Sequence, residues 1–227
     1  MSGYRTARPS LLAVSHGTDD AAGAAAIAAL VAQVRVALPA VDVVEAFVDV
    51  QQPDAAELAP TIDGPLVIVP LLLSRGFHVH HDLHAIAATR PLTVVSDPLG
   101  PDVRLAEVLA QRLPDDERPV ILAVAGSRDP RSLTDAEGMG ALLGAHLGRD
   151  VHLAYLAARQ PDLPTALAEH PDAVVSTYLL AQGYFFDLAQ RQAAGREVTL
   201  PLLDGGAVPH PLIDLVVSRY EAAAAGF

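Results

Sequence analysis

The sequence predicts an α/β protein made of two doubly wound domains, each with a parallel sheet. Short apolar runs alternate along the chain with longer stretches of helical period. The runs are continuous Val/Ile/Leu segments, which is typical of strands covered on both faces. The second half of the chain also repeats the first. With 227 residues, 51% of them hydrophobic, the chain is long enough to build two domains with real cores.

Eight apolar runs are the candidate strands: Ser10–Val14, Val41–Val48, Pro65–Leu73, Leu92–Val95, Val120–Ala125, Val151–Leu156, Ala173–Leu180 and Glu197–Leu200. Helical stretches lie between them, for instance Asp19–Leu38, Val103–Arg112 and Ala136–Leu147. Because strands and helices alternate, we expect parallel sheets with right-handed crossovers.

Four anchors in the same order show the repeat, with offsets of 107 to 110 residues. They pair Leu11–Val14 with Ile121–Val124, Ala46-Phe47 with Ala154-Tyr155, Leu72-Leu73-x-x-Gly76-Phe77 with Leu179-Leu180-x-x-Gly183-Tyr184, and 99–103 with 207–211. So long a period indicates a duplicated domain and not a solenoid. We therefore expect an N-terminal domain at 1–113, a charged linker bounded by prolines at 114–119, and a C-terminal domain at 120–227.

Composition excludes several classes of function. The chain has 27 acidic and 15 basic residues and a net charge of −12, which argues against nucleic acid and anionic membranes as partners. Every basic residue is Arg, so Schiff-base and Walker lysines are excluded, and the lack of Cys excludes disulfides, cysteine nucleophiles and cysteine-ligated Fe–S clusters. No apolar stretch approaches the roughly 20 residues of a membrane span. We expect a soluble cytoplasmic protein.

Three ionisable residues follow predicted strands: His16, Asp49 and His78. Aligned by the repeat, their counterparts are Gly126, Ala157 and Phe185. Ligands of open α/β sheets bind at the carboxyl ends of strands, so the polar chemistry is expected in the first half. For Asp49, an exposed helix N-cap explains the sequence nearly as well.

Further histidines, His80, His81 and His84, follow His78. A helix that begins near Phe77 would place His84 on one face with His80 and His81, and such spacings can chelate a metal. For His84 we favour a solvated surface position, and His80 and His81 stay open. Ser15 beside His16 suggests a hydrolase only weakly, because no nucleophile elbow is present.

At these residues the sequence resembles a known family. The segments that carry the likeness are Ser15-His16-Gly17, Ala46-Phe47-Val48-Asp49, Gly76-Phe77-His78-Val79-x-x-Asp82 and Ala-Gly-Ser-Arg-Asp-Pro at 125–130. They are similar to the sirohydrochlorin chelatases, the CbiX/SirB group of class II tetrapyrrole chelatases. The repeat matches the long, two-domain form with a degenerate second half.

The resemblance implies a chelatase-like fold whose two domains face each other across a cleft. It implies insertion of a divalent metal into sirohydrochlorin, with Fe²⁺ giving siroheme and Co²⁺ serving cobalamin synthesis as the alternative. The family's two histidines fall on His16 and His78 as catalytic and metal-binding residues. Asp49 stands where the family often has Glu, as a third metal ligand. No Fe–S cluster or nucleotide is implied, and a nickel chelatase or a non-catalytic metal or tetrapyrrole carrier are further alternatives.

The chemistry fits these residue types. Neutral imidazoles bind borderline divalent metals and accept protons near pH 7, so two histidines can hold the metal and take up the pyrrole protons. Sirohydrochlorin carries eight carboxylates and the chain is acidic, so local donors and a flat wall must hold the ring. The expected substrate-binding residues are Ser15, Gly17, Arg75, Gly76, Phe77, Gly126, Ser127, Arg128, Tyr184 and Phe185. His80, His81 and Asp82 are expected to support them, and a monomer is the simplest assembly.

Overall fold

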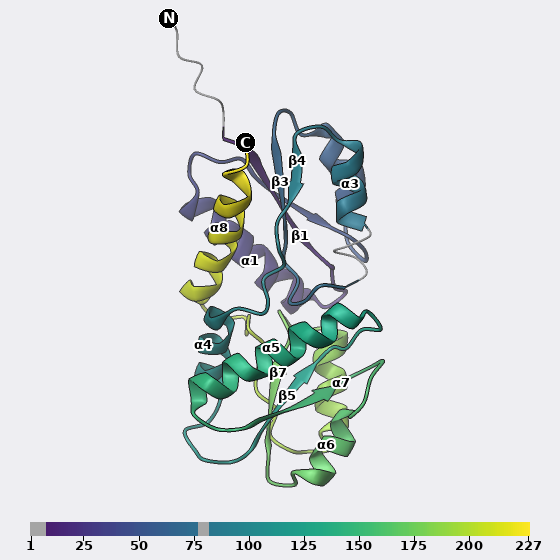
Figure 1. Cartoon of the computed structure of the whole chain (residues 1–227), viewed down its shortest axis with the longest axis vertical. Helices are drawn as coiled ribbons and strands as arrows, with labels where there is room; N and C mark the ends of the chain where they lie inside the picture. Colours follow the sequence, from purple (N-terminus) through teal and green to yellow (C-terminus); the bar gives the residue numbers. More distant parts are fainter. Residues whose placement is uncertain (1–7, 77–81) are drawn as a thin grey trace, which may run out of the picture.

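The computed structural model describes residues 8–76 and 82–227 and contains two parallel sheets flanked by helices (Figure 1). The first sheet has the order β2-β1-β3-β4, with β1 (Ser10–Ser15), β2 (Val43–Phe47), β3 (Leu66–Pro70) and β4 (Thr93–Val95). The second has the order β6-β5-β7, with β5 (Val120–Val124), β6 (Val151–Tyr155) and β7 (Val174–Tyr178). Every strand pair is parallel, which confirms the predicted fold class.

The helices of the first half are α1 (Ala21–Ala37), α2 (Ala55–Leu58), the 3₁₀ turn η1 (Ala59–Thr61), α3 (His84–Thr89) and α4 (Val103–Arg112). Those of the second half are α5 (Pro130–Leu147), α6 (Leu163–Glu169), α7 (Tyr184–Gln192) and α8 (His210–Ala224). Helix α5 begins six residues before the predicted Ala136, because Asp129 caps it and Pro130 starts its first turn. Within residues 8–76 and 82–227, no helix has both the length and the apolar character that a bilayer crossing requires.

The last predicted strand, Glu197–Leu200, forms only an isolated bridge between Val198 and Val175. The reason lies in the side chain of Thr199. The backbone N–H of Thr177 donates to Thr199 Oγ1 at 3.3 Å instead of to a carbonyl, and Thr177 Oγ1 donates to the Thr199 carbonyl at 3.0 Å. These side-chain bonds end the ladder after one bridge.

Strand pairing corrects one anchor of the repeat. The His16 carbonyl accepts from the Asp49 N–H at 3.1 Å, and the Ala125 carbonyl accepts from the Ala157 N–H at 3.0 Å. Gly17 and Gly126 share a positive φ (92° and 88°), and a Cβ on either would overlap the carbonyl oxygen of Asp49 or Ala157. Gly126 is therefore the counterpart of Gly17, and the counterpart of His16 is Ala125. The offset of 110 at this anchor was wrong by one residue.

A second repeated motif confirms the duplication in detail. The tripeptide Gln-Pro-Asp occurs at 52–54 and again at 160–162. In each copy the Gln side-chain oxygen accepts from the Asp backbone N–H, at 2.9 Å for Gln52 and 3.0 Å for Gln160. In each copy the Asp then caps the following helix. This motif was present in the sequence and was missed there.

The last helices of the two halves are exchanged. Helix α8 packs on α1 and β3 of the first sheet, whereas α4 packs on α5 and β7 of the second (Figure 1). The hydroxyl of Tyr220 on α8 donates to the Pro9 carbonyl at the start of β1, at 2.6 Å. One apolar core consequently joins both sheets and contains Leu11, Leu105, Leu122 and Leu215. The division of the chain at 114–119 stays a prediction about the repeat, while the packing of the halves interlocks.

Candidate functional site

The topology brings four loops to one place. In the first sheet β1 lies between β2 and β3, so the chain leaves β1 and β3 at a switch point, where α/β proteins bind ligands. The loops after β5 and β7 hold the same position in the second sheet. The two edges meet: a Cβ at Gly183, after β7, would come within 2.7 Å of Thr18 Oγ1, after β1. The candidate site therefore lies at the boundary between the halves.

His16 stands directly after β1 with its side chain exposed. Its backbone is held by the bond from Asp49, and the next turn is fixed by Thr18, whose N–H donates to Gln51 Oε1 at 2.9 Å. Asp20 then caps α1 by accepting from the Gly23 N–H at 2.6 Å. The loop that carries His16 is thus tied to the end of β2 and to the start of α1.

Asp49 lies beside His16, as the sequence predicts, with its carboxylate exposed. One carboxylate oxygen accepts from the Val50 N–H at 2.7 Å. The alternative interpretation of Asp49 as a helix cap is wrong, because Asp54 caps α2. Asp49 remains close enough in the chain fold to act with His16.

Ser15, expected to touch the substrate, is only 2% exposed. Its hydroxyl is closed off from solvent, and within the described part of the chain it has no hydrogen-bond partner. The prediction is corrected: as the last residue of β1, Ser15 turns its side chain into the packed interior and does not face a ligand.

Arg75, also expected to bind substrate carboxylates, is engaged elsewhere. Its backbone N–H donates to Asp135 Oδ2 at 2.6 Å, and its Nη2 pairs with Asp135 Oδ1 at 2.6 Å. The hydrogen bond to this carboxylate, together with its charge, raises the pKa of the Arg75 guanidinium. Asp135 lies on α5, so Arg75 joins the two halves. Its side chain is still half-exposed, and its contact with substrate stays a prediction.

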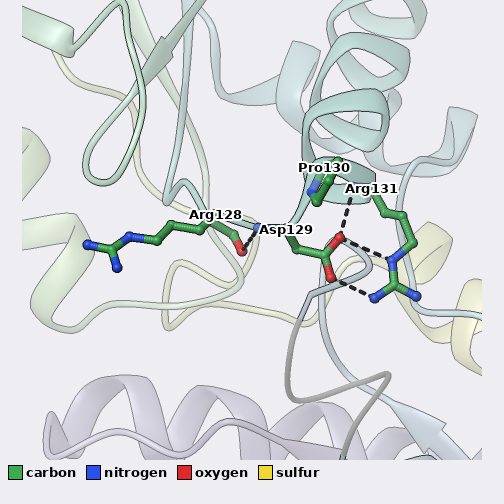
Figure 2. A pocket seen from close by; sticks show the side chains of 5 residues that line it. Arg128, Asp129, Pro130 and Arg131 are labelled. Carbon is green, nitrogen blue, oxygen red and sulfur yellow. Dashed lines mark hydrogen bonds and ion pairs between the residues drawn. The ribbon is translucent and has the colours of Figure 1, made fainter.

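The Arg128 side chain has no such ion-pair partner among the described residues. It lines an open hollow of about 650 Å³ together with Ser127, Asp129, Pro130 and Arg131 (Figure 2). Arg131 is paired with Asp129 at 2.6 Å, whereas the Arg128 side chain points away from that pair and makes no hydrogen bond or ion pair with the residues that the structure describes. Its guanidinium is exposed and available to an anionic group. The hollow falls in the size range of small-molecule sites.

The loop beside this hollow is held by its neighbours. The Ser127 hydroxyl accepts from the Asp129 N–H at 3.2 Å, and the Ser127 carbonyl accepts from Arg159 Nε. Arg159 Nη2 also donates to the Asp129 carbonyl at 2.8 Å. Gly126 precedes this loop, so both small residues predicted here, Gly126 and Ser127, lie at its base.

Tyr184 and Phe185 begin helix α7 and form an edge-to-face pair, with ring centroids 5.3 Å apart. Tyr184 is 68% exposed, and Phe185 packs partly against the apolar cluster of the second sheet that contains Ile121 and Val175. Gly183 places this pair next to the loop after β1. An exposed aromatic at this edge suits contact with a flat, apolar ring face.

His78, the second predicted metal-binding histidine, lies outside the described residues, as do Phe77, His80 and His81. On either side, a Cβ on Gly76 would meet no atom of the described residues within 4 Å, Asp82 is half-buried and His84 is exposed at the start of α3. In the parts of the chain at 8–76 and 82–227, no group of three His, Asp or Glu residues could hold a metal. Of the predicted ligands, the structure brings His16 and Asp49 together.

Two residues that face the first half were missed in the sequence. Asp135 lies one residue before the predicted helix Ala136–Leu147 and inside the observed α5, and a buried carboxylate there requires a cationic partner. Tyr178 ends β7 with its ring buried, and a buried tyrosine hydroxyl usually finds a hydrogen-bond partner. These were the available signals, but neither identifies the partner.

Comparisons with known proteins give the same fold. Residues 10–116 match the CbiX family model. SirB from Bacillus subtilis with Fe³⁺ matches with a TM-score of 0.78 at 19% identity, over 96% of each chain. SirB from Bacillus subtilis subspecies spizizenii in complex with cobalt matches with a TM-score of 0.79 at 21% identity, again over 96% of each.

A third structure, CbiX, the terminal enzyme for biosynthesis of siroheme in denitrifying bacteria, matches with a TM-score of 0.69 at 18% identity. That match covers 94% of this chain and 99% of the other. No curated protein matches the sequence. At identities this low, the structural likeness shows the fold alone, over 94–96% of this chain. The family model matches residues 10–116. The resemblance seen in the motifs is thereby confirmed.

Proposed function

Because residues 10–116 match the CbiX family model, we propose that the protein is a sirohydrochlorin chelatase that inserts a divalent metal into the ring. The observation that carries this proposal is the meeting of the two sheet edges. There, His16 follows β1 at the switch point of the first sheet, the exposed Arg128 follows β5, and the exposed Tyr184 follows β7. A metal-binding base, an anion-binding group and a flat wall are the three things that this reaction requires.

The first half would handle the metal and the protons. Insertion of M²⁺ releases two protons from the inner pyrrole nitrogens, and two neutral imidazoles, His16 and His78, can accept one each. Before that, the imidazole nitrogens would hold the incoming metal with help from the carboxylate of Asp49. Once the metal passes to the ring, the same imidazole nitrogens are free to take up the protons. Because the metal is a substrate that must leave with the ring, an incomplete and exchangeable ligand set suits the task better than a closed structural site.

The second half would hold the ring. Arg128 would bind a peripheral carboxylate, as guanidinium groups do. Tyr184 and Phe185 would stack on the macrocycle, and the loops at Gly17 and Gly126 are proposed to border it. Gly76, Phe77 and Ser127 are proposed to complete the ring site, with His80, His81 and Asp82 in support.

We favour Fe²⁺ as the metal, which makes siroheme the product. Cobalt is the second candidate, because SirB proteins of the same fold have been seen with Fe³⁺ and with cobalt. Nickel insertion and a carrier without turnover are further alternatives. The cytoplasmic location and the monomeric state stay predictions of the sequence.

The decisive experiment is anaerobic incubation of the purified protein with sirohydrochlorin and Fe²⁺, Co²⁺ or Ni²⁺ in turn, followed by absorbance. A chelatase metallates many equivalents of the ring, whereas a carrier stops at one. His16→Ala should abolish the acceleration over the spontaneous reaction. His146→Ala, which alters an exposed histidine in the last turn of α5, is the matched control and should not. Single-equivalent binding by the unaltered protein with all three metals would contradict the proposal.

A further inference from the structure

The segment Leu73–Gly76, which leads from β3 toward His78, is gripped by the other half of the chain. The hydroxyl of Tyr178, at the end of β7, donates to the Leu73 carbonyl at 2.9 Å. Two residues later the Asp135 carboxylate on α5 accepts from the backbone and from the side chain of Arg75, at 2.6 Å each. Both the chain path and a side chain are thereby fixed from across the boundary.

The Asp135 carboxylate depends on Arg75 for its compensation. The carboxylate is 1% exposed, and a buried charge requires full compensation by partners. Arg75 supplies it through its N–H, its Nε and its Nη2. Loss of either partner would leave a buried charge or an unfilled site, so the contact holds the two halves in a single relation.

The Tyr178 contact depends on a third segment. A Cβ at Gly100 would overlap the Tyr178 hydroxyl and crowd the Leu73 carbonyl, so only glycine leaves room for the two to meet. The ring is buried, and burial raises the pKa of Tyr178 far above its ordinary value, which keeps the hydroxyl protonated and able to donate. Gly100 lies just before α4, so the start of the exchanged helix adjoins this contact.

The opposite side of the pseudo-symmetric boundary lacks these contacts. Gln182-Gly183 repeats Arg75-Gly76, but there the Gln182 carbonyl lies against Gly23 of α1, where a Cβ would overlap it. With the corrected repeat, the counterpart of Asp135 is Ala26. Close backbone packing replaces the ion pair, so the polar grip is confined to the side of the boundary that leads to His78.

We propose that Asp135 and Tyr178 are positioning residues, which act from the second half to set the place of Leu73–Gly76, the segment that follows β3 and precedes His78 in the sequence. The second half is therefore more than a wall for the ring or a remnant of duplication. The kinetic part of this inference rests on the proposed chelatase function, but the grip itself does not.

The test uses Asp135→Asn and Tyr178→Phe in the full chain, with Asp204→Asn as control. The control breaks the Arg112–Asp204 ion pair (2.9 Å), which has no hydrogen bond to 71–76. The first readout is hydrogen exchange of the Arg75 amide by NMR. We expect exchange about tenfold faster in both variants and unchanged in the control. The Tyr178→Phe result is the sharper one, because Tyr178 does not bond that amide.

The second readout is steady-state chelation. Displacement of Leu73–Gly76 should lower kcat about tenfold, because His78, proposed to handle the metal, follows two residues later in the sequence. KM for sirohydrochlorin should change less than about twofold, since Arg128 and Tyr184 are unaltered. An unchanged Arg75 exchange rate in Tyr178→Phe would show that Tyr178 does not hold the segment Leu73–Gly76 in place. Faster exchange with normal kcat overturns the positioning role and leaves a purely structural contact. Absence of turnover in the unaltered protein would instead defeat the chelatase proposal, and the exchange data would still decide the grip.

Discussion

Replacement of Gly17 by alanine tests the geometry of the loop that carries His16. Gly17 has a φ of 92°, and its missing Cβ would overlap the carbonyl oxygen of Asp49. Asp49 in turn donates its N–H to the His16 carbonyl. A methyl group at Gly17 must therefore push on Asp49, the residue whose N–H holds the His16 carbonyl.

The cost has two parts. Left-handed backbone costs an L-residue about 1–2 kcal/mol. Relief of an overlap with fixed backbone costs about 1–3 kcal/mol more, as in overpacked cores. Gly64→Ala separates the two, because Gly64 has a φ of 74° but nothing within 4 Å of an added Cβ. We expect a loss of about 3 kcal/mol at Gly17 and about 1 kcal/mol at Gly64.

Urea unfolding measures the difference. A single transition is expected because one core joins both sheets, and the slope should not change between variants. Gly126→Ala should be destabilised as much as Gly17→Ala, since it has the same backbone and the same overlap with Ala157. Turnover should fall in Gly17→Ala and stay normal in Gly64→Ala.

The reasoning is refuted if Gly17→Ala is no less stable than Gly64→Ala, because the overlap with Asp49 would then be relieved without cost. A destabilised Gly17→Ala with normal kcat would show that His16 does not depend on this contact for its place.

Four further predictions use other features of the site and scaffold. His16→Ala should lower kcat about 100-fold or more while the ring still binds, and normal turnover would exclude it as a base. Arg128→Gln should raise KM for sirohydrochlorin about threefold in low salt and less in high salt, since exposed charges are screened; a salt-independent effect would argue against ion pairing. Tyr184→Ala should weaken ring binding about fivefold in a fluorescence titration, and unaltered binding would remove it from the wall. Burial raises the pKa of the Glu45 carboxyl against the opposing effect of Arg35. Its neutral form is thus favoured on folding, so Glu45→Gln should stabilise the protein at pH 7. This gain should vanish as the pH falls below the ordinary carboxyl range, and a gain in melting temperature that persists there would contradict it.

The sequence predicted strands better than their register. Every residue of β5 is buried, as are nearly all of β1, so both faces of these strands select the same apolar residue types. The alignment of Leu-Ala-Val in the two halves was therefore wrong by one residue, and no residue within either strand indicated the correct register. The register is set instead at the strand ends, where Gly17 and Gly126 meet carbonyl oxygens that admit no side chain. Repeated turn residues are therefore the better guide to aligning duplicated halves.

The candidate site was predictable only as far as topology places it. His16 follows a central strand, and the switch-point rule identifies such a position without knowledge of the rest of the fold. Arg75 follows a strand too, but its role depends on a carboxylate 60 residues later. Whether an arginine at a strand end meets a ligand or a partner domain depends on how the two halves dock, and no local pattern carries that information. Ser15 shows the same limit, because one residue along a strand separates a buried hydroxyl from an exposed imidazole.

The exchange of α4 and α8 explains why the boundary can support a site that uses both halves. Asp102 caps α4 and binds Arg104, and Arg219 of α8 adds a longer contact at 3.4 Å. Arg104 also donates to Ser218 on α8 at 3.0 Å. The crossing of these helices pins the halves at one place, and the contacts of Asp135 and Tyr178 pin them at another.

Two separated attachments suppress rotation about either one, so the loops after β1, β5 and β7 and the segment Leu73–Gly76 are held in a fixed relation. Such an arrangement suits a rigid planar substrate, because a preorganised site does not have to be ordered at the moment of binding. It also gives the second half a physical reason to persist. Its sheet supplies the surface on which α4 folds, and its last helix covers the sheet that carries His16. Without that half, α1 and β3 would lose the cover of α8, and the first sheet would lose part of the scaffold that fixes the histidine loop.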